Sequence, residues 1–261
     1  MEIRHPLDTR LSALLRSDRR LRGLFSGLPS PAIVEMCAYA GFEFVIIDNE
    51  HGCADLETTE NMLRAARASG IIPVVRCLPQ DISRVLDMGA GAVQIPMVSS
   101  AAQARDLVEQ VRYPAVGRRG SAFSSRAAGY GAFGGIEHTR RSNEGISLIA
   151  MIETPEGVEN AQAIASVEGV DAVFVGPNDL AHAMGHNNDW ASPPVEAAIE
   201  KALRAVAAAG KCAGTIALTP EAEDKYAGWG ARYFANVATS IITQALRKAA
   251  SRGQEGISIQ Y

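Results

Sequence analysis

Short apolar runs alternate along the chain with longer amphipathic stretches. The apolar, β-branched runs predict strands at residues 21–28, 42–48, 71–76, 92–98, 147–153, 170–176, 212–218 and 231–237. Between them, patterns of helical period cover residues 31–40, 56–69, 101–112, 155–167, 194–209, 220–228 and 240–250. Several of these patterns begin near a proline and end at a glycine such as Gly70, which are expected helix start and stop signals.

Eight strands in strict alternation with helices predict a parallel sheet, because parallel neighbours need crossover connections. Eight such units in 261 residues favour an α/β fold of the (β/α)8 (TIM) barrel type. We expect one domain over residues 1–261, with a short N-terminal helix and a C-terminal helix. An open doubly wound sheet is the alternative, but the segment after the first strand, SGLPSP, lacks the glycine fingerprint typical of that fold.

One connection is unusually long. Between Met97 and Ile146 the sequence predicts a helix and then a Gly/Ser/Arg-rich stretch, GRRGSAFSSRAAGYGAFGG. Long loops inside compact domains are usually functional or disordered.

Composition narrows the functional class. The net charge is −4 with 47% hydrophobic residues, and no basic stripe indicates a nucleic-acid partner. No apolar run approaches the roughly 20 residues that span a bilayer, and the start MEIRHPLDTR lacks the apolar core of a signal peptide, so we expect a cytoplasmic protein without a membrane partner. The four cysteines are widely spaced and indicate neither a zinc site nor a disulfide framework.

Polar residues collect at the predicted strand ends. The second strand ends in Asp48, with Glu50 and His51 directly after it, and the third ends in Arg76. The fifth ends in Glu153, and the sixth runs into the motif GPNDL at residues 176–180. In a parallel barrel the catalytic groups lie at the carboxyl ends of the strands, so this set predicts an active site there.

Glu153 and Asp179 are carboxylates at the ends of adjacent strands. Such a pair suits Mg²⁺ or Mn²⁺, with water and substrate completing the coordination. A salt bridge to Arg76 is the structural alternative. The turn from strand to helix in GPNDL also directs the backbone N–H groups of Asn178 and Asp179 toward the rim, where they could hold a carboxylate or phosphate.

These groups suit chemistry beside a carbonyl. A 2-oxo acid can chelate the metal, Arg76 adds positive charge at the oxygen that becomes negative, and His51 can move a proton. Asp87 and Asp48 are both candidates to orient the imidazole. A lysine Schiff base is disfavoured, because no lysine falls at a strand's carboxyl end; the four are Lys201, Lys211, Lys225 and Lys248.

The motifs AGFEFVIIDNEHG, PVVR, RYPAVGRRG, MIET and VEGVDAVFVGPNDLA resemble the HpcH/HpaI aldolase family, from about Leu21 to Val237. The resemblance implies a barrel of the phosphoenolpyruvate/pyruvate type. It also implies a divalent-metal (class II) aldolase using Mg²⁺, Mn²⁺ or Co²⁺, which cleaves a 4-hydroxy-2-oxo acid to pyruvate or a related 2-oxo acid and an aldehyde. Homo-oligomers, often hexamers with exchanged C-terminal helices, are a further implication.

The resemblance assigns roles to single residues. His51 would be the catalytic base, Asp87 the acid that raises its basicity, and Arg76 the residue that stabilises the enolate. Glu153 and Asp179 would hold the metal, and the substrate would lie against Gly176, Pro177, Asn178 and Asp179. Many members have glutamine where this chain has Met151, a departure that concerns substrate contact.

Two other functions fit the same rim. An acyl-thioester lyase similar to the citrate lyase β-chain would share the metal acids and need a coenzyme A groove, and a non-enzymatic barrel could simply bind a small acid. His182 and His186 are four residues apart, but Gly185 weakens a helix there, so they are interpreted as surface histidines.

Overall fold

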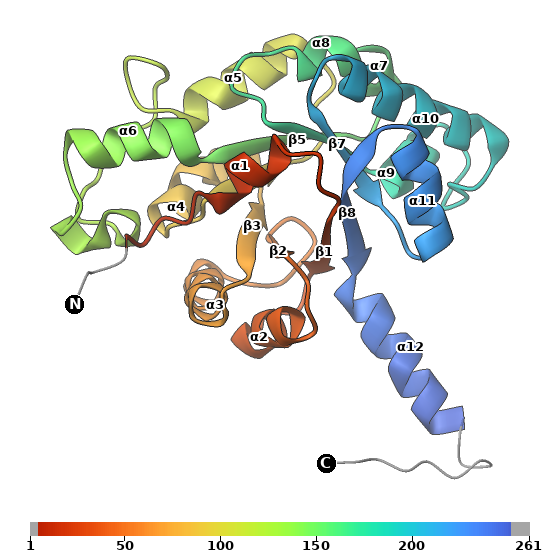
Figure 1. Ribbon diagram of the computed structural model, residues 1–261, viewed down its shortest axis with the longest axis horizontal. Coiled ribbons are helices and arrows are strands. Elements are labelled where there is room, and N and C mark those ends of the chain that lie inside the picture. Colours follow the sequence, from red (N-terminus) through yellow and green to blue (C-terminus); the bar gives the residue numbers. More distant parts are fainter. Residues whose placement is uncertain (1–4, 252–261) are drawn as a thin grey trace.

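The predicted strands close into one barrel. A computed structural model describes residues 5–251. Its eight strands pair in chain order, each parallel to the next, and β8 returns to pair with β1 (Figure 1). They are β1 (Leu21–Ser26), β2 (Phe44–Asp48), β3 (Ile72–Arg76), β4 (Ala92–Ile95), β5 (Ser147–Ile152), β6 (Ala172–Val175), β7 (Cys212–Ile216) and β8 (Ala231–Val237). The (β/α)8 barrel predicted from the alternation is confirmed.

Helices surround the barrel and follow the expected start and stop rules. For example, Asp55 caps α3 by accepting the N–H of Thr58, and Gly70 ends that helix at φ 84°. The helices are α1 (Arg10–Leu15), α2 (Pro31–Tyr39), α3 (Leu56–Ser69), α4 (Ile82–Asp87), α5 (Ala101–Val111), α6 (Ile136–Gly145), α7 (Pro155–Glu159), α8 (Ala161–Ala165), α9 (Pro177–Ala183), α10 (Pro193–Ala208), α11 (Pro220–Gly228) and α12 (Ala238–Ser251), with 3₁₀ turns η1 (Pro79–Asp81) and η2 (Arg126–Gly131).

The structure differs from the pattern at several places. The long connection contains α6, which the pattern missed because only His138 and Ser142 of that helix are buried. The short helix α4 was missed as well, and the helix predicted over residues 155–167 is split at Asn160 into α7 and α8. Strand β4 ends at Ile95, earlier than predicted, because Met97 turns into the left-handed region at φ 59°.

Alternate strand residues fill the barrel interior. Phe44 of β2 stacks on Tyr233 of β8, with 4.2 Å between ring centroids, and Phe174 of β6 meets the same tyrosine edge-on. Leu11 and Leu15 of α1 pack into this interior cluster, and α1 lies across the end of the barrel where the strands begin (Figure 1). The barrel is therefore closed at that end and open at the carboxyl ends of its strands.

Helix α12 behaves differently from the others. It leaves the barrel after β8 and projects from its side (Figure 1). Ala238 is its buried residue, whereas Leu246 is 64% exposed. Across residues 5–251, none of the helices has the length and apolar character required to cross a membrane.

Candidate active site

The carboxyl ends of the strands surround a cavity of about 360 Å³. Most of the polar residues singled out in the sequence line it, and they come from four strands: Asp48, His51, Arg76, Glu153, Asn178 and Asp179. Its apolar walls are formed by Phe25, Met151, Phe174, Ile216 and Val237. The structure therefore brings the predicted strand-end residues together around one opening.

Arg76 is held by two acids from the β2 end. Its Nε donates to Asp48 Oδ1 at 2.8 Å and its Nη2 to Asp48 Oδ2 at 2.6 Å, while Nη1 lies 3.1 Å from Glu50 Oε2. Burial raises the pKa of Asp48, but the hydrogen bonds and charge of Arg76 outweigh burial and leave that pKa below its usual range. The guanidinium also lies 4.8 Å from the centroid of the Phe25 ring.

These contacts test whether Glu153 and Asp179 form a salt bridge with Arg76. The ion pairs of Arg76 go to Asp48 and Glu50, and not to Glu153 or Asp179. Glu153 and Asp179 are therefore not explained as partners of this arginine.

Glu153 is a buried acid without an ion pair among the described residues. It is 2% exposed, and its Oε2 accepts the N–H of Met97 at 2.8 Å. Burial raises the pKa of Glu153 to about 7; the Met97 N–H opposes this rise, and the negative charges of Asp179 and Glu50 add to it. A buried carboxylate beside a second one is costly unless a cation compensates it.

The GPNDL turn is built to approach this acid. A Cβ on Gly176 would lie 2.6 Å from Glu153 Oε1, so glycine is needed where the loop passes the carboxylate. Pro177 then starts α9, and Asp179 is an exposed residue in its first turn. Asp179 thereby reaches the same rim from the neighbouring strand.

The residues present fit a hard divalent cation. Glu153 and Asp179 offer carboxylate oxygens at one opening, the ligand type that Mg²⁺ and Mn²⁺ prefer. Over the described part of the chain, no three His, Cys, Asp or Glu side chains converge as a complete ligand set. Two carboxylates suit a cation such as Mg²⁺, which keeps several positions for water and substrate.

His51 stands at the mouth of the cavity. Its side chain is 64% exposed, and its Nε2 lies 3.9 Å from Glu50 Oε2. Asp48 binds the backbone of this loop instead, since its Oδ1 accepts the N–H groups of Glu50 and His51. Of the acids considered from sequence, Glu50 is therefore the one near the imidazole, and Asp48 fixes the loop that carries it.

Asp87 is the expected site residue that one chain does not bring to the cavity. It ends α4, which precedes β4, so it lies toward the beginning of the strands, away from His51. Its Oδ1 accepts a hydrogen bond from Arg119 Nη2 at 2.7 Å, and it does not line the cavity. Within one chain Asp87 is thus not the partner of His51; sequence order placed it after the third strand, but a helix separates it from that strand's end.

Sequence reasoning missed two supports of the site. The Met97 N–H that binds Glu153 depends on a left-handed backbone, which no residue type signals here. Gly52 follows His51, and a Cβ there would lie 2.1 Å from the Asp48 carbonyl oxygen, so the loop must carry glycine at that point. The glycine in DNEHG was the available signal for the second.

The lysines, the other two histidines considered from sequence and the cysteines do not line the cavity. Lys211 donates to the Val170 carbonyl at 2.6 Å just before β7, and none of the four lysines lines the cavity. His182 is exposed and contacts Asn188, in keeping with a surface histidine, while His186 lies beyond the end of α9. Cys37, Cys77 and Cys212 are buried, and Cys53 is exposed.

Comparison with known proteins gives the chain a family. It is 38% identical over 252 residues to a hydroxypyruvate/pyruvate aldolase of Pseudomonas aeruginosa, covering 95% of this chain and 93% of that protein. It is 36% identical over 238 residues to a 2-keto-3-deoxy-L-rhamnonate aldolase of Klebsiella pneumoniae, covering 89% and 88%.

A solved structure of an HpcH/HpaI aldolase/citrate lyase family protein from Burkholderia cenocepacia J2315 superposes with a TM-score of 0.89 and 32% identity, covering 94% of this chain and 99% of that one. The names of these relatives support a lyase of the aldolase type. The model of the HpcH/HpaI aldolase/citrate lyase family matches residues 21–242, which is most of the sequence, and the chain belongs to that family.

Proposed function

We propose that this protein is a divalent-metal-dependent aldolase that reversibly cleaves a 4-hydroxy-2-oxo acid to pyruvate, or a related 2-oxo acid, and an aldehyde. The observation that carries the proposal is the pair Glu153 and Asp179, which share the cavity with Arg76 but form no ion pair with it. The aldolase relatives support the reaction class.

Glu153 and Asp179 are the residues that would hold the metal. A bound divalent cation supplies a Lewis acid that stabilises negative charge developing on the 2-oxo oxygen. Arg76 adds a fixed positive charge on the same side of the cavity. Asp48 accepts hydrogen bonds from Nε and Nη2 of Arg76, so the guanidinium plane is fixed before the substrate binds. Such preorganisation favours charge stabilisation.

His51 is placed to move the proton. In the cleavage direction it would accept the proton of the C4 hydroxyl as the C3–C4 bond breaks, giving the aldehyde, and return a proton to C3 to give the 2-oxo acid. Its exposure at the mouth fits contact with the C4 end of the substrate, farther from the floor than the carboxylate end. Glu50, whose Oε2 lies 3.9 Å from His51 Nε2, is the acid positioned to orient the imidazole.

The cavity floor indicates the substrate class. Met151 is 2% exposed and lies with Phe174 and Ile216 against the space next to Glu153. An apolar floor beside a metal and an arginine suits a small 2-oxo acid with a methyl or methylene at C3. The amides of Asn178 and Asp179 at the start of α9 would hold its carboxylate.

The test is a screen of 4-hydroxy-2-oxo acids for pyruvate release, with and without EDTA. We expect release that EDTA abolishes and added Mn²⁺ or Mg²⁺ restores. Trapping of a pyruvate–enzyme adduct by borohydride would instead show Schiff-base chemistry. Metal-dependent cleavage of an acyl-thioester, without aldol cleavage, would favour the citrate lyase β-chain-like alternative. Ligand binding without exchange of the pyruvate C3 protons would favour a non-enzymatic barrel.

We also propose that the protein works as a homo-oligomer, and specifically as a hexamer, the assembly that its family resemblance implies. The support is α12, which projects from the barrel and exposes Ile241 and Leu246. Light scattering of the purified chain tests this, and Leu246→Glu should yield a smaller species. A wild-type monomer would contradict the proposal.

A further inference from the structure

One side of the cavity at the carboxyl ends of the strands is apolar. Three neighbouring strands build it, since Phe25 comes from β1, Val237 from β8 and Ile216 from β7. Phe25 and Val237 are register partners across β1 and β8, so their side chains point to the same face of the sheet. Thr239, an exposed residue at the start of α12, lines the cavity above them at the rim. Phe25, Ile216 and Val237 are called the apolar wall below.

The apolar wall has surface that a ligand can cover. Ile216 and Val237 are half-buried, and Phe25 is 7% exposed. The Phe25 ring is held by its neighbours, because it meets the Phe174 ring edge-on at 5.7 Å between centroids and the Arg76 guanidinium lies 4.8 Å from its own centroid. The wall is therefore a fixed apolar surface beside the arginine of the site, and covering it with an alkyl group is favourable.

The positive charge of this cavity is already engaged. Among the described residues that line it, Arg76 is the only lysine or arginine, and it pairs with Asp48 and Glu50. A doubly charged metal would balance Glu153 and Asp179, so the acids still exceed the cations by one charge in the metal-bound enzyme. A second anionic group on the substrate would find no cation here to pair with, and leaving water would cost it free energy.

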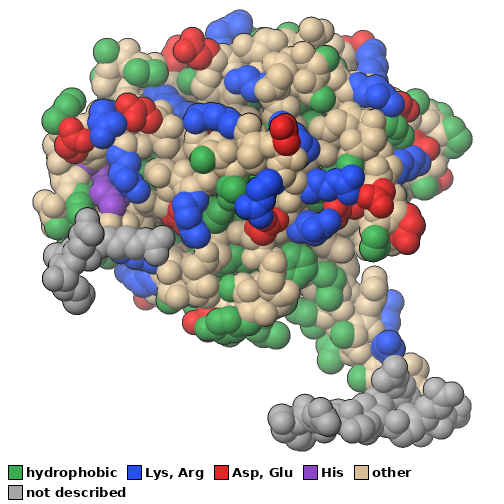
Figure 2. All heavy atoms as spheres, in the orientation of Figure 1, with side chains coloured by type: hydrophobic (Ala, Val, Ile, Leu, Met, Phe, Trp, Pro, Cys, Tyr) green, Lys and Arg blue, Asp and Glu red, His purple; other side chains and the backbone are tan. Residues whose placement is uncertain are grey.

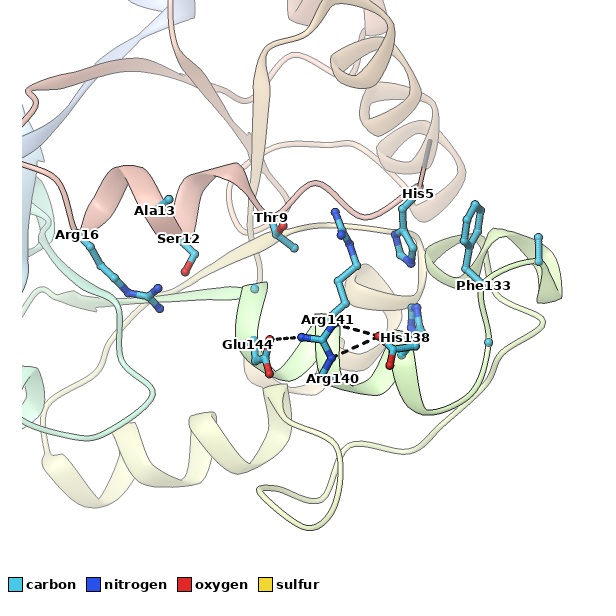
Figure 3. A pocket seen from close by; sticks show the side chains of 14 residues that line it. His5, Thr9, Ser12, Ala13, Arg16, Phe133, His138, Arg140, Arg141 and Glu144 are labelled. Atoms are coloured by element: carbon cyan, nitrogen blue, oxygen red, sulfur yellow. Dashed lines mark hydrogen bonds and ion pairs between the residues drawn. The ribbon is translucent and has the colours of Figure 1, made fainter. Parts of the chain in front are cut away.

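The chain carries unpaired positive charge at the opposite end of the barrel. A second cavity, of about 650 Å³, lies there between α1 and α6, and its lining includes Arg16, Arg140 and Arg141 (Figure 3). Arg141 donates to the Leu7 carbonyl and forms no ion pair among residues 5–251. Figure 2 shows basic side chains spread over this side of the molecule. The interior side chains of the barrel, with Leu11 beneath them, separate the two cavities, so this charge cannot pair with a substrate at the carboxyl ends of the strands.

We infer that the site selects an uncharged aldehyde whose alkyl substituent lies against the apolar wall, and that it discriminates against aldehydes that carry a carboxylate or a phosphate. The inference rests on the proposed aldol reaction and concerns the half of the substrate which that reaction leaves open. The 2-oxo acid half takes the metal and Arg76, so the aldehyde half is left with the wall. An alkyl group gains there by leaving water, whereas an anionic group loses its hydration without gaining a partner.

The selectivity is measured with two aldehydes of equal length. Butanal and succinic semialdehyde differ in their last group, which is a methyl in the first and a carboxylate in the second. With pyruvate as the other reactant and metal in excess, kcat/KM should be higher for butanal by about tenfold or more. Binding without turnover is measured by calorimetry with 2-oxoheptanoate and 2-oxoheptanedioate, which lack the 4-hydroxyl group and cannot be cleaved. The Kd should be lower for 2-oxoheptanoate by a similar factor.

Two substitutions test the wall itself, through the ratio of kcat/KM for butanal to that for succinic semialdehyde. Val237→Ser removes apolar surface and should lower this ratio about tenfold. Thr239→Lys places a cation at the rim and should lower it about fivefold by improving the anionic aldehyde. Ser240→Lys is the matched control, because Ser240 is the adjacent exposed residue and does not line the cavity, and it should keep the wild-type ratio. A partial loss of folded enzyme affects both aldehydes equally and leaves the ratio unchanged.

Exchange of the pyruvate C3 protons, which needs no aldehyde, separates this inference from the proposed function. If the protons exchange in a metal-dependent way and succinic semialdehyde is used as well as butanal or better, the aldolase stands and the inference about its aldehyde is wrong. If neither exchange nor cleavage occurs with metal, the proposed function fails and the inference fails with it. Equal effects of Thr239→Lys and Ser240→Lys would also overturn the inference, because net charge and not the wall would then set the preference.

Discussion

The two ends of the barrel carry opposite excesses of charge. At the carboxyl ends of the strands, one arginine is shared by Asp48 and Glu50, and two further acids, Glu153 and Asp179, remain beside it. At the other end the acids are used up on Arg140, and Arg141 remains. In each place most charges are paired locally, and the unpaired remainder is acidic at one end and basic at the other.

The largest effect should come from His51, which stands exposed at the mouth of the acidic end. His51→Ala should preserve the fold and metal binding and lower kcat for aldol cleavage by roughly 10²–10⁴, the usual range for a lost general acid–base. The measurement is pyruvate release from one cleavable 4-hydroxy-2-oxo acid, with His182→Ala as the exposed control histidine. A folded His51→Ala enzyme with unchanged kcat would remove His51 from the mechanism.

The hydrogen bonds between Arg76 and Asp48 can be removed while a positive charge is kept at position 76. Arg76→Lys keeps a cation but loses the two parallel hydrogen bonds to Asp48, so the charge is no longer fixed. We expect kcat to fall by about 10²–10³, the effect typical of one lost charge-stabilising donor. Arg118→Lys, whose ion pairs with Asp106 and Glu109 are exposed, should change nothing. Near-full activity of Arg76→Lys would make Arg76 a structural ion-pair residue.

The unpaired acid should have a thermodynamic signature in the metal-free protein. Because the pKa of Glu153 is raised from 4.5 to about 7, the native state keeps a proton that the unfolded chain has lost, and stability falls as the pH rises between these values. Glu153→Gln removes this penalty. The change that it causes in the free energy of unfolding should therefore be about 3 kcal/mol more favourable above pH 7 than at pH 4.

Urea unfolding in EDTA at pH 4 and at pH 8 measures that difference. The same acid predicts that metal affinity increases as the pH rises through about 7, because the ligand must be ionised. A Glu153→Gln effect that is the same at both pH values would show that this carboxyl does not hold the proton.

The smallest effect is expected at Glu50. Glu50→Gln removes the acid nearest to the His51 ring but leaves Arg76 bound to Asp48, so kcat should fall less than tenfold. The comparison is with His51→Ala on the same substrate. A loss as large as that of His51→Ala would mean that Glu50 itself transfers the proton.

Most of the fold could be predicted from the sequence, because strands buried on both faces leave continuous apolar runs. All residues of β2, β3 and β5 are buried, and each gives such a run. Helix α6 could not be found in this way, since its outer face is polar and its ends carry no strong signal. Its position depends on residues far away in the sequence: Arg141 donates to the Leu7 carbonyl, and Asn143 accepts the N–H of Tyr113.

The site was predictable as far as strand ends alone determine it. Arg76 and Glu153 end inward-facing rows of their strands, so the barrel brings them to one rim. The position of Asp87 could not be predicted, because sequence order cannot tell which end of the barrel a loop faces once a short helix such as α4 intervenes. The choice of Glu50 over Asp48 as the neighbour of the imidazole depends on side-chain directions within a turn, which pattern does not encode.

The side chains that fill the barrel interior, with Leu11 and Leu15 beneath them, close the bottom of the cavity, so that it opens only at the carboxyl ends of the strands. In a cavity with one opening, the fragment that binds deepest must bind first and dissociate last. If the 2-oxo acid half lies against Met151 and the aldehyde half near His51, the aldehyde must dissociate before the 2-oxo acid can leave. Product-inhibition kinetics would then show ordered release, in which the 2-oxo acid is a competitive inhibitor against the uncleaved substrate.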